Sequence, residues 1–416
     1  MKKIILFFWI ISISIGVAAQ SLLDTYQQGK VKLTPDKTYG VGNNFDEIWG
    51  NAQSRHNSLI VLSNGSVIVN TKGKHYRFTP NGKFEKEIIL KNSSGKELQN
   101  RPIQGFINNQ FFTNLDNMGK MICTDMEGKY VKTLTLDYMA SDMVTMKDNK
   151  IAVVGWVIWK DRFRNFVSIV DYNTNKEKIV WDKFTDRNST AFTASSNKMR
   201  QVSRAYIQEI RSFPRYGYSY FGVDRHIGKR PVIEFANNEL VVALPSEDEI
   251  RFFDNQGNLK ATKKIEWKAN VISVEEQKRV LKEAIETHRK TALHITNGIS
   301  EEDAQEARSR ILKEKEELLS NIKTEITLPH LTSVIKDSDE NLLFFEFPKK
   351  SGNNLFHVWI YKNDGKFACK SSFVCDEYNL SITSSRMVFH EGYLYALQSL
   401  KNEKTLRLVR FKLENE

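Results

Sequence analysis

Apolar and polar positions follow one another in a unit of roughly 40 residues that recurs along the chain. Each unit has an apolar run, a polar turn, a second apolar run, and a third run that ends at a Gly- or Asn-marked turn. The first copy begins at Leu59–Leu62, turns at Ser63–Ser66 and continues at Val67–Val69. Because several short strands per repeat are typical of propeller blades, the pattern predicts an all-β repeat fold.

Six copies of the unit can be placed along the chain. They open with the apolar runs Leu59–Leu62, Gly105–Ile107, Met143–Met146, Val232–Phe235, Leu331–Ile335 and Met387–Phe389. The sixth copy supplies only about three strands, so we expect Lys30–Thr34 to add the missing strand and close the ring. The sequence therefore predicts a six-bladed β-propeller. A seventh blade hidden in the first insertion is the alternative.

The turns that end the third run carry a common signature. They read Asn81-Gly82-Lys83, Glu127-Gly128-Lys129 and Asp364-Gly365-Lys366. With the strand-turn-strand pattern before them, they resemble the six-bladed propellers of the TolB-like and NHL-like group. The resemblance covers nearly the whole chain except two insertions. It implies the fold and a secreted bacterial protein, since exported members are common in Gram-negative bacteria, and it implies little about function.

The first insertion, residues 182–231, is rich in aromatic and basic side chains. Tyrosine and phenylalanine stack on flat sugar or peptide surfaces, and arginine pairs with carboxylates. The ligand-binding candidates of this segment are Arg215, Tyr216, Tyr218, Arg225 and His226. The alternative is a loop that covers a blade and whose aromatic residues belong to the core.

The second insertion, residues 273–328, has a helical pattern. Ser273 with Glu276 forms a capping box, Asn297-Gly298 ends the first helix, and Ser300 starts another. The two apolar stripes are Leu281, Ile285, His288, Ala292, Ile295 and Ala304, Ala307, Ile311, Leu318, Ile322. These features predict an α-helical hairpin. It is either a docking surface for a partner or a hairpin whose stripes pack on each other or on the propeller.

The N-terminus has the pattern of a signal peptide spanning residues 1–19. Lys2 and Lys3 precede a mainly apolar run, Ile4–Val17, and Val17-Ala18-Ala19 has the small residues of a cleavage site. We expect an exported protein, located in the periplasm, on the outer surface or outside the cell. The mature chain, residues 20–416, is then a single propeller with no stable membrane span, and an uncleaved anchor is the alternative.

The net charge is +11, or +9 without Lys2 and Lys3. A basic surface favours polyanions such as acidic glycans or an anionic membrane, whereas an exported chain rarely meets nucleic acid. A basic surface without a specific partner is the alternative. The chain has three cysteines. Cys123 is expected to be a buried thiol, and Cys369 and Cys375 can pair only if the chain reverses between them, because one extended strand would separate them by about 20 Å.

No catalytic or metal-binding motif is evident. The sequence has neither a Gly-x-Ser-x-Gly elbow nor a Walker-type phosphate loop, and its histidines lack His-x-x-x-His spacing. Lactonase-like propeller enzymes bring metal ligands together from different blades, so linear spacing does not decide the question. The metal-ligand candidates near blade starts are Asp142, Asp224, Glu234 and His330. Structural or solvated roles are the alternative for all four.

These observations favour an exported binding or protein-interaction module of the cell envelope, without a cofactor. Its expected partner is an envelope or extracellular protein or a glycan. A propeller enzyme, a lyase or hydrolase with a divalent cation in the channel, is the second hypothesis. A purely structural envelope protein is the third.

Overall fold

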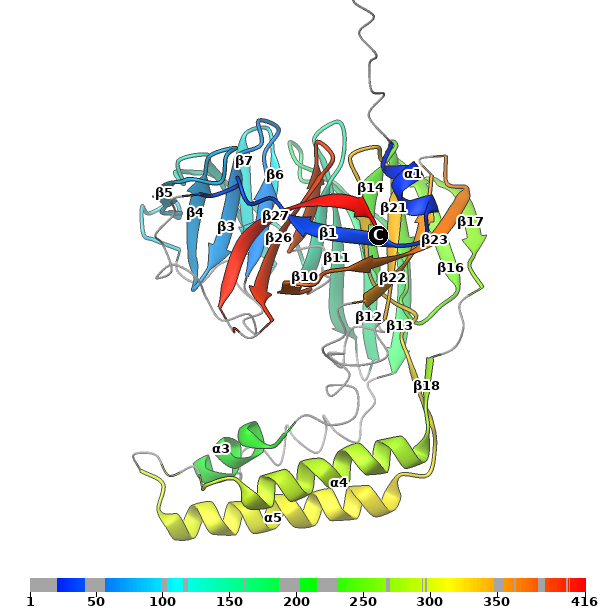
Figure 1. Cartoon of the computed structure of the whole chain (residues 1–416). Helices are drawn as coiled ribbons and strands as arrows, with labels where there is room; N and C mark the ends of the chain where they lie inside the picture. Colours follow the sequence, from blue (N-terminus) through cyan, green and yellow to red (C-terminus); the bar gives the residue numbers. More distant parts are fainter. Residues whose placement is uncertain are drawn as a thin grey trace, which may run out of the picture.

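The computed structural model describes residues 21–41, 57–98, 103–114, 119–159, 162–186, 203–214, 230–266, 270–293, 295, 298–347, 355–362, 364–380, 386–401, 403 and 405–416. Their strands form a ring of blades, and three helices form a separate layer beneath one face of the ring (Figure 1). The predicted β-propeller with inserted helices is confirmed.

Four blades are separate four-stranded antiparallel sheets. Blade 1 contains β2 (Ser58–Val61), β3 (Val67–Thr71), β4 (Lys74–Phe78) and β5 (Phe84–Ile88). Blade 2 contains β6 (Ile103–Ile107), β7 (Gln110–Asn114), β8 (Lys120–Asp125) and β9 (Tyr130–Thr135). Blade 3 contains β10 (Met139–Thr145), β11 (Lys150–Trp159), β12 (Arg162–Asp171) and β13 (Glu177–Asp186). Blade 4 contains β14 (Val232–Ala236), β15 (Glu239–Ala243), β16 (Glu249–Asp254) and β17 (Leu259–Lys264).

Blades 5 and 6 share one nine-stranded sheet. Blade 5 contains β20 (Leu331–Lys336), β21 (Leu342–Glu346), β22 (Leu355–Tyr361) and β23 (Phe367–Val374). Blade 6 contains β25 (Met387–His390), β26 (Tyr393–Leu400), β27 (Leu406–Asn415) and the N-terminal β1 (Val31–Pro35), and the short β24 (Tyr378–Asn379) also pairs with β26.

Strand β1 closes the ring as expected. It pairs antiparallel with β27, from Val31 opposite Asn415 to Pro35 opposite Phe411, and parallel with β23. The inner strands β2, β6, β10, β14, β20 and β25 contact one another in this order, and β25 returns to β2. The first insertion contributes a helix, α3 (Arg204–Ser212), to the described structure rather than a blade. Six blades therefore account for the ring.

The core lies in the seams between blades. Neighbouring residues of one strand pack in opposite directions, so that Val153 faces blade 2 while Val154 faces blade 4. Both faces of a blade are thus covered, and this explains why Leu240–Ala243 reads as an unbroken apolar run. Helix α1 (Leu22–Gln27) packs Tyr26 against Phe373 on the side of the ring away from the three-helix layer (Figure 1).

All three cysteines are free thiols. Cys123 is buried in β8, as predicted. Cys369 lies in β23 and Cys375 directly follows that strand. Because the strand is extended between them, the chain does not reverse and no disulfide forms. Among the helices of the described segments, none is long and apolar enough to cross a membrane.

Candidate functional site

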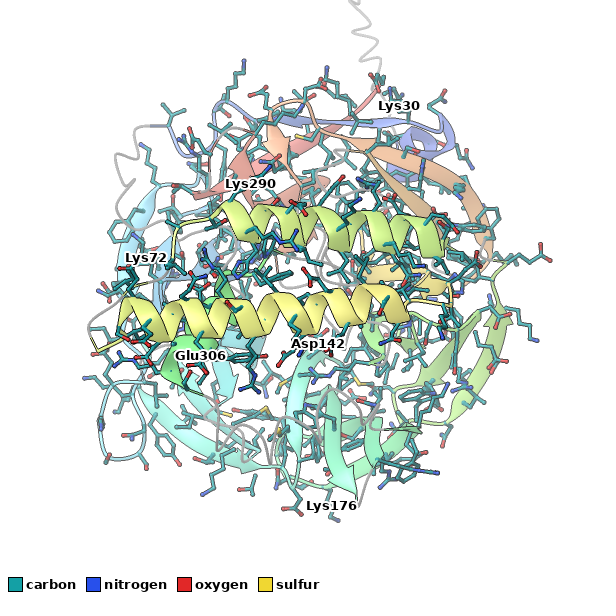
Figure 2. The ribbon with its side chains drawn as sticks, turned by 90° about the horizontal axis from the view of Figure 1, so that it is seen from below. Lys30, Lys72, Asp142, Lys176, Lys290 and Glu306 are labelled. Carbon is teal, nitrogen blue, oxygen red and sulfur yellow. The ribbon has the colours of Figure 1, made fainter. Side chains whose placement is uncertain are left out.

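Both insertions leave the ring on the same face. The first joins β13 to β14 and the second joins β17 to β20, and each such connection leads from the outer strand of one blade to the inner strand of the next. The second insertion begins as a two-stranded stalk, β18 (Asn270–Ile272) with β19 (Ile326–Leu328), and continues as α4 (Val274–Lys290) and α5 (Glu301–Asn321). Helices α4 and α5 run side by side across the centre of the ring (Figure 2).

Helix α3 packs against this hairpin, so the two insertions form one three-helix layer. Phe213 from the first insertion shares an apolar cluster with Leu281, Ile285 and Ile311 from the second. Each helix is capped by a serine whose hydroxyl accepts a backbone N–H from three residues ahead. The caps are Ser203 to Tyr206 at 3.2 Å, Ser273 to Glu276 at 3.2 Å and Ser300 to Asp303 at 3.1 Å. The sequence predicts the last two caps but not the union of the insertions.

A buried ionic cluster lies at the centre of the layer. Arg308 of α5 donates from Nε and Nη2 to Glu209 of α3 at 3.1 and 3.0 Å. The same guanidinium donates to the carbonyls of Thr291 at 2.6 Å and Ala292 at 2.9 Å, just beyond α4. His288 Nε2 of α4 lies 3.4 Å from Glu209. We call Glu209, His288 and Arg308 the latch cluster.

The predicted end of the first helix is wrong. Helix α4 ends at Lys290 rather than at Asn297-Gly298, because Thr291 is extended and its carbonyl and that of Ala292 bind Arg308. Ala292 and Ile295 are consequently exposed and do not join the apolar stripe. In α5 Leu318 is also exposed, whereas the other predicted stripe residues are buried or half-buried. His288 is buried, as its place on the stripe predicts.

Two predicted carboxylates approach each other on the inner strands. Glu234 of β14 accepts a backbone N–H from Phe235 at 2.9 Å and one from Lys336 of β20 at 3.4 Å. The pKa of Glu234 is raised to about 7: burial is the main cause and the nearby Asp142 contributes, while Lys336 and the two N–H donors oppose the shift. Glu234 keeps partial contact with solvent although protein atoms surround its carboxylate.

Asp142 belongs to β10 and accepts the backbone N–H of Met143 at 2.9 Å. The register of β10 against β11 shifts between Ala140 and Asp142, so the carboxylate directly follows a β-bulge. Bulges often redirect side chains next to functional sites. Asp142 lies near the middle of the ring, beside α5 when seen from below (Figure 2).

The described residues do not assemble a metal centre. They contain no group of three or more histidine, cysteine, aspartate or glutamate side chains placed to hold a metal ion. His330 therefore does not complete a set with Asp142 and Glu234. Its backbone N–H binds the Pro245 carbonyl at 2.6 Å at the entrance to β20. Asp224 lies outside the described residues.

All five aromatic and basic ligand-binding candidates, Arg215, Tyr216, Tyr218, Arg225 and His226, also lie outside the described residues. The described ends of this insertion also contain arginine and aromatic side chains, and these make cation–π contacts. The Arg230 guanidinium lies 5.2 Å from the Trp156 ring, and Arg164 binds Asp182 at 2.7 Å while lying 5.8 Å from the Phe184 ring. Trp156 and Arg164 belong to the long β11–β12 hairpin, which extends toward the three-helix layer (Figure 1). The cation–π pair of Arg230 with Trp156 thus joins the end of the first insertion to blade 3, and the contacts of Arg164 hold β12 and β13 together.

No protein-family model matches this chain, and no curated protein matches it either. Solved structures match over most of its length. A member of the DUF4221 family from Bacteroides vulgatus has 12% identity and a TM-score of 0.50, over 94% of this chain and 100% of that one. A gluconolactonase from Xanthomonas campestris has 8% identity and a TM-score of 0.41, over 92% and 97%. Virginiamycin B lyase from Staphylococcus aureus has 10% identity and a TM-score of 0.38, over 86% and 97%.

These structural neighbours are distant six-bladed propellers. At such identities they show the fold alone. The chain is therefore a β-propeller protein with inserted helices.

Proposed function

We propose that this protein is an exported binding or protein-interaction module of the cell envelope, and that its partner, an envelope or extracellular protein or a glycan, contacts the three-helix layer. The layer carries the proposal, because two insertions from separate blade connections converge into one capped and packed unit across the ring. A blade scaffold alone needs no such addition. The resemblance to secreted TolB-like and NHL-like propellers and the N-terminal signal pattern support the cellular location.

Site-specific photo-crosslinking in the native host tests the proposal. A photoreactive residue replaces Lys282 of α4 or Lys313 of α5, both exposed, and the matched control replaces Lys176 or Lys366 in exposed blade turns. We expect a discrete adduct from the layer positions and none from the control positions. Equal adducts at all four positions, or none in the layer, would contradict the proposal. The mass of the exported chain tests the signal peptide, since cleavage after Ala19 leaves Gln20 as the first residue.

The proximity of Asp142 and Glu234 favours a second candidate, a propeller lyase or hydrolase that uses a divalent cation. Two carboxylates are fewer than the three protein ligands typical of catalytic zinc sites, so the described residues do not yet fit a metal. Metal analysis of the purified protein separates the candidates. One metal ion per chain, lost in Asp142→Asn, would favour the enzyme, and a metal-free protein that still crosslinks through the layer would favour the binding module.

A further inference from the structure

The latch cluster holds the three-helix layer together through groups that have almost no contact with water. Glu209 and His288 are fully buried and Arg308 is 7% exposed. The side chain of Arg308, which belongs to α5, bonds both to α3 and to the residues just beyond α4. Breaking a buried ion pair leaves an uncompensated charge and is strongly destabilising. The packing of α3 on the hairpin therefore depends on the charge balance of these three side chains.

We propose that the three-helix layer is a pH-controlled latch, closed while the latch cluster is electrically balanced and opened when added protons give it a net positive charge. With the His288 imidazole unprotonated, the charges of the Glu209 carboxylate and the Arg308 guanidinium cancel, and the cluster has no net charge. A proton taken up by His288 makes the cluster positive.

The pairing of Arg308 with Glu209 determines whether acid opens or closes the layer. Arg308 already neutralises Glu209, with two N–H groups on the same carboxylate oxygen. A proton on His288 therefore gains little from that carboxylate and bears the cost of burying a charge. Separation of the helices gives the protonated groups access to water, so acid favours the open form. A histidine in contact with water changes its charge between about pH 7 and pH 5, so the open form gains its proton in this range.

Among the described residues, further charged side chains of α5 contact residues of the first insertion. Glu314 of α5 accepts the Tyr206 hydroxyl at 2.5 Å and is paired with Arg310 at 3.1 Å. Lys315 of α5 places its ammonium 5.6 Å from the Phe213 ring and adds a further positive charge. The Phe213 ring, directly after α3, lies 4.9 Å from the His288 ring of α4 and gives it an apolar neighbour.

Opening would change access to the middle of the ring. Helix α3 lies on the ring side of the hairpin, and the hairpin crosses the ring where Asp142 lies (Figures 1 and 2). Loss of the α3 contacts separates the two insertions, which are continuous with different blade connections. The proposed opening involves only the three helices of the layer, so it does not depend on which ligand or partner the protein binds.

Hydrogen exchange read by mass spectrometry on the whole chain tests the proposal. After correction for the pH dependence of intrinsic exchange, we expect peptides covering α3 to lose protection at least about tenfold from about pH 7 to about pH 5, while β15 keeps its protection. His288→Phe, which keeps a ring beside Phe213 but cannot titrate, should keep α3 protected over the same range. Glu209→Gln, which leaves Arg308 uncompensated, should open the layer already at neutral pH.

Two results would overturn the latch. One is wild-type α3 that stays equally protected at both pH values. The other is His288→Phe that loses protection as much as the wild type does. The double variant Glu209→Leu with Arg308→Met keeps these outcomes interpretable, since apolar side chains of similar size replace the ion pair. It should restore the protection of α3 that Glu209→Gln loses at neutral pH, and continued loss would show that charge balance does not hold the layer. Protection of β15 in every variant reports whether the ring has folded.

Discussion

At Gly128 the backbone of blade 2 touches the backbone that follows β5 of blade 1. The φ of Gly128 is +81°, its carbonyl accepts the Lys91 N–H at 2.8 Å, and a Cβ there would lie 2.4 Å from the Ile89 carbonyl oxygen. Gly128→Ala combines a strained φ with this clash, so we expect a loss of more than about 2 kcal/mol in the free energy of unfolding. Denaturant unfolding measures it.

Gly95→Ala is the matched control, because Gly95 has a φ of +78° and nothing within 4 Å of an added Cβ. Its loss in the free energy of unfolding should come from backbone strain alone, about 1 kcal/mol. Equal losses in the two variants would mean that the contact with Ile89 does not constrain the seam.

Glu234 makes stability depend on pH in an unusual direction. Its pKa is about 7 in the folded state against an ordinary value of 4.5, so between these values the folded state keeps a proton that the unfolded state has lost. Stability therefore falls as the pH rises from about 4.5 to about 7. Each pKa unit corresponds to about 1.4 kcal/mol, and partial solvent access reduces the total to the order of 2 kcal/mol.

Glu234→Gln should remove this slope and gain stability relative to the wild type above about pH 7. Urea unfolding at several pH values gives the difference between the two proteins. Asp142→Asn is a second check: it removes the neighbouring negative charge and should lower the pKa of Glu234, moving the slope to lower pH. Parallel curves for wild type and Glu234→Gln would contradict the assignment.

At the scale of elements, the sequence predicts what local periodicity controls and misses what distant contacts control. Blade strands follow from apolar runs separated by polar turns, and the caps at Ser273 and Ser300 follow from nearby residues in the sequence. The end of α4 depends on Arg308, seventeen residues beyond Thr291, and the docking of α3 depends on Glu209. The sequence does contain one indication that Arg308 is buried, because it lies on the apolar stripe of α5 between Ala307 and Ile311.

The candidate site around Asp142 and Glu234 can likewise be predicted from the sequence only in part. Asp142 and Glu234 can be selected as carboxylates near blade starts, but their approach depends on the register of separate blades and on the bulge before Asp142. Lys336 was missed because a lysine at a strand end has no distinctive pattern. Its backbone N–H, rather than its charge, contacts Glu234 directly.

The two-stranded stalk of β18 and β19 is the point at which the α4–α5 hairpin can be removed from the ring. Ile272 and Ile326 face each other in the antiparallel pair of β18 and β19, so an Asn-Gly turn between them would close the stalk as a hairpin. We expect the ring to unfold as cooperatively as before when this turn replaces residues 273–325, because the blade seams contain the main core. Peptides covering α3 should lose their hydrogen-exchange protection, since Phe213 loses its cluster with Leu281 and Ile311. Unfolded blades in this variant would show that the ring depends on the layer.

At the scale of the whole molecule, closure joins the two ends of the described chain. Leu33 of β1 is buried in the cluster that joins blades 5 and 6, and Asp36, just beyond β1, pairs with Arg410 of β27 at 2.7 Å. Hydrogen bonds from Thr38 and Arg410 hold the pKa of Asp36 down at about 2 against the opposing effect of burial, so this pair stays charged over the physiological range. A ring without β1 would expose the edges of β23 and β27.

Removal of residues 1–36 should therefore give a chain that aggregates and loses its cooperative unfolding transition. A synthetic peptide of residues 21–41, added in trans, should restore a monomeric folded ring, because strand addition supplies both the ladder bonds to β27 and the apolar face of Leu33. The same peptide with Leu33→Asp is the control and should fail, since it buries a charge in that cluster. Light scattering and thermal unfolding report the outcome. A truncated chain that is already monomeric and cooperative, or rescue by both peptides alike, would show that ring closure does not depend on β1.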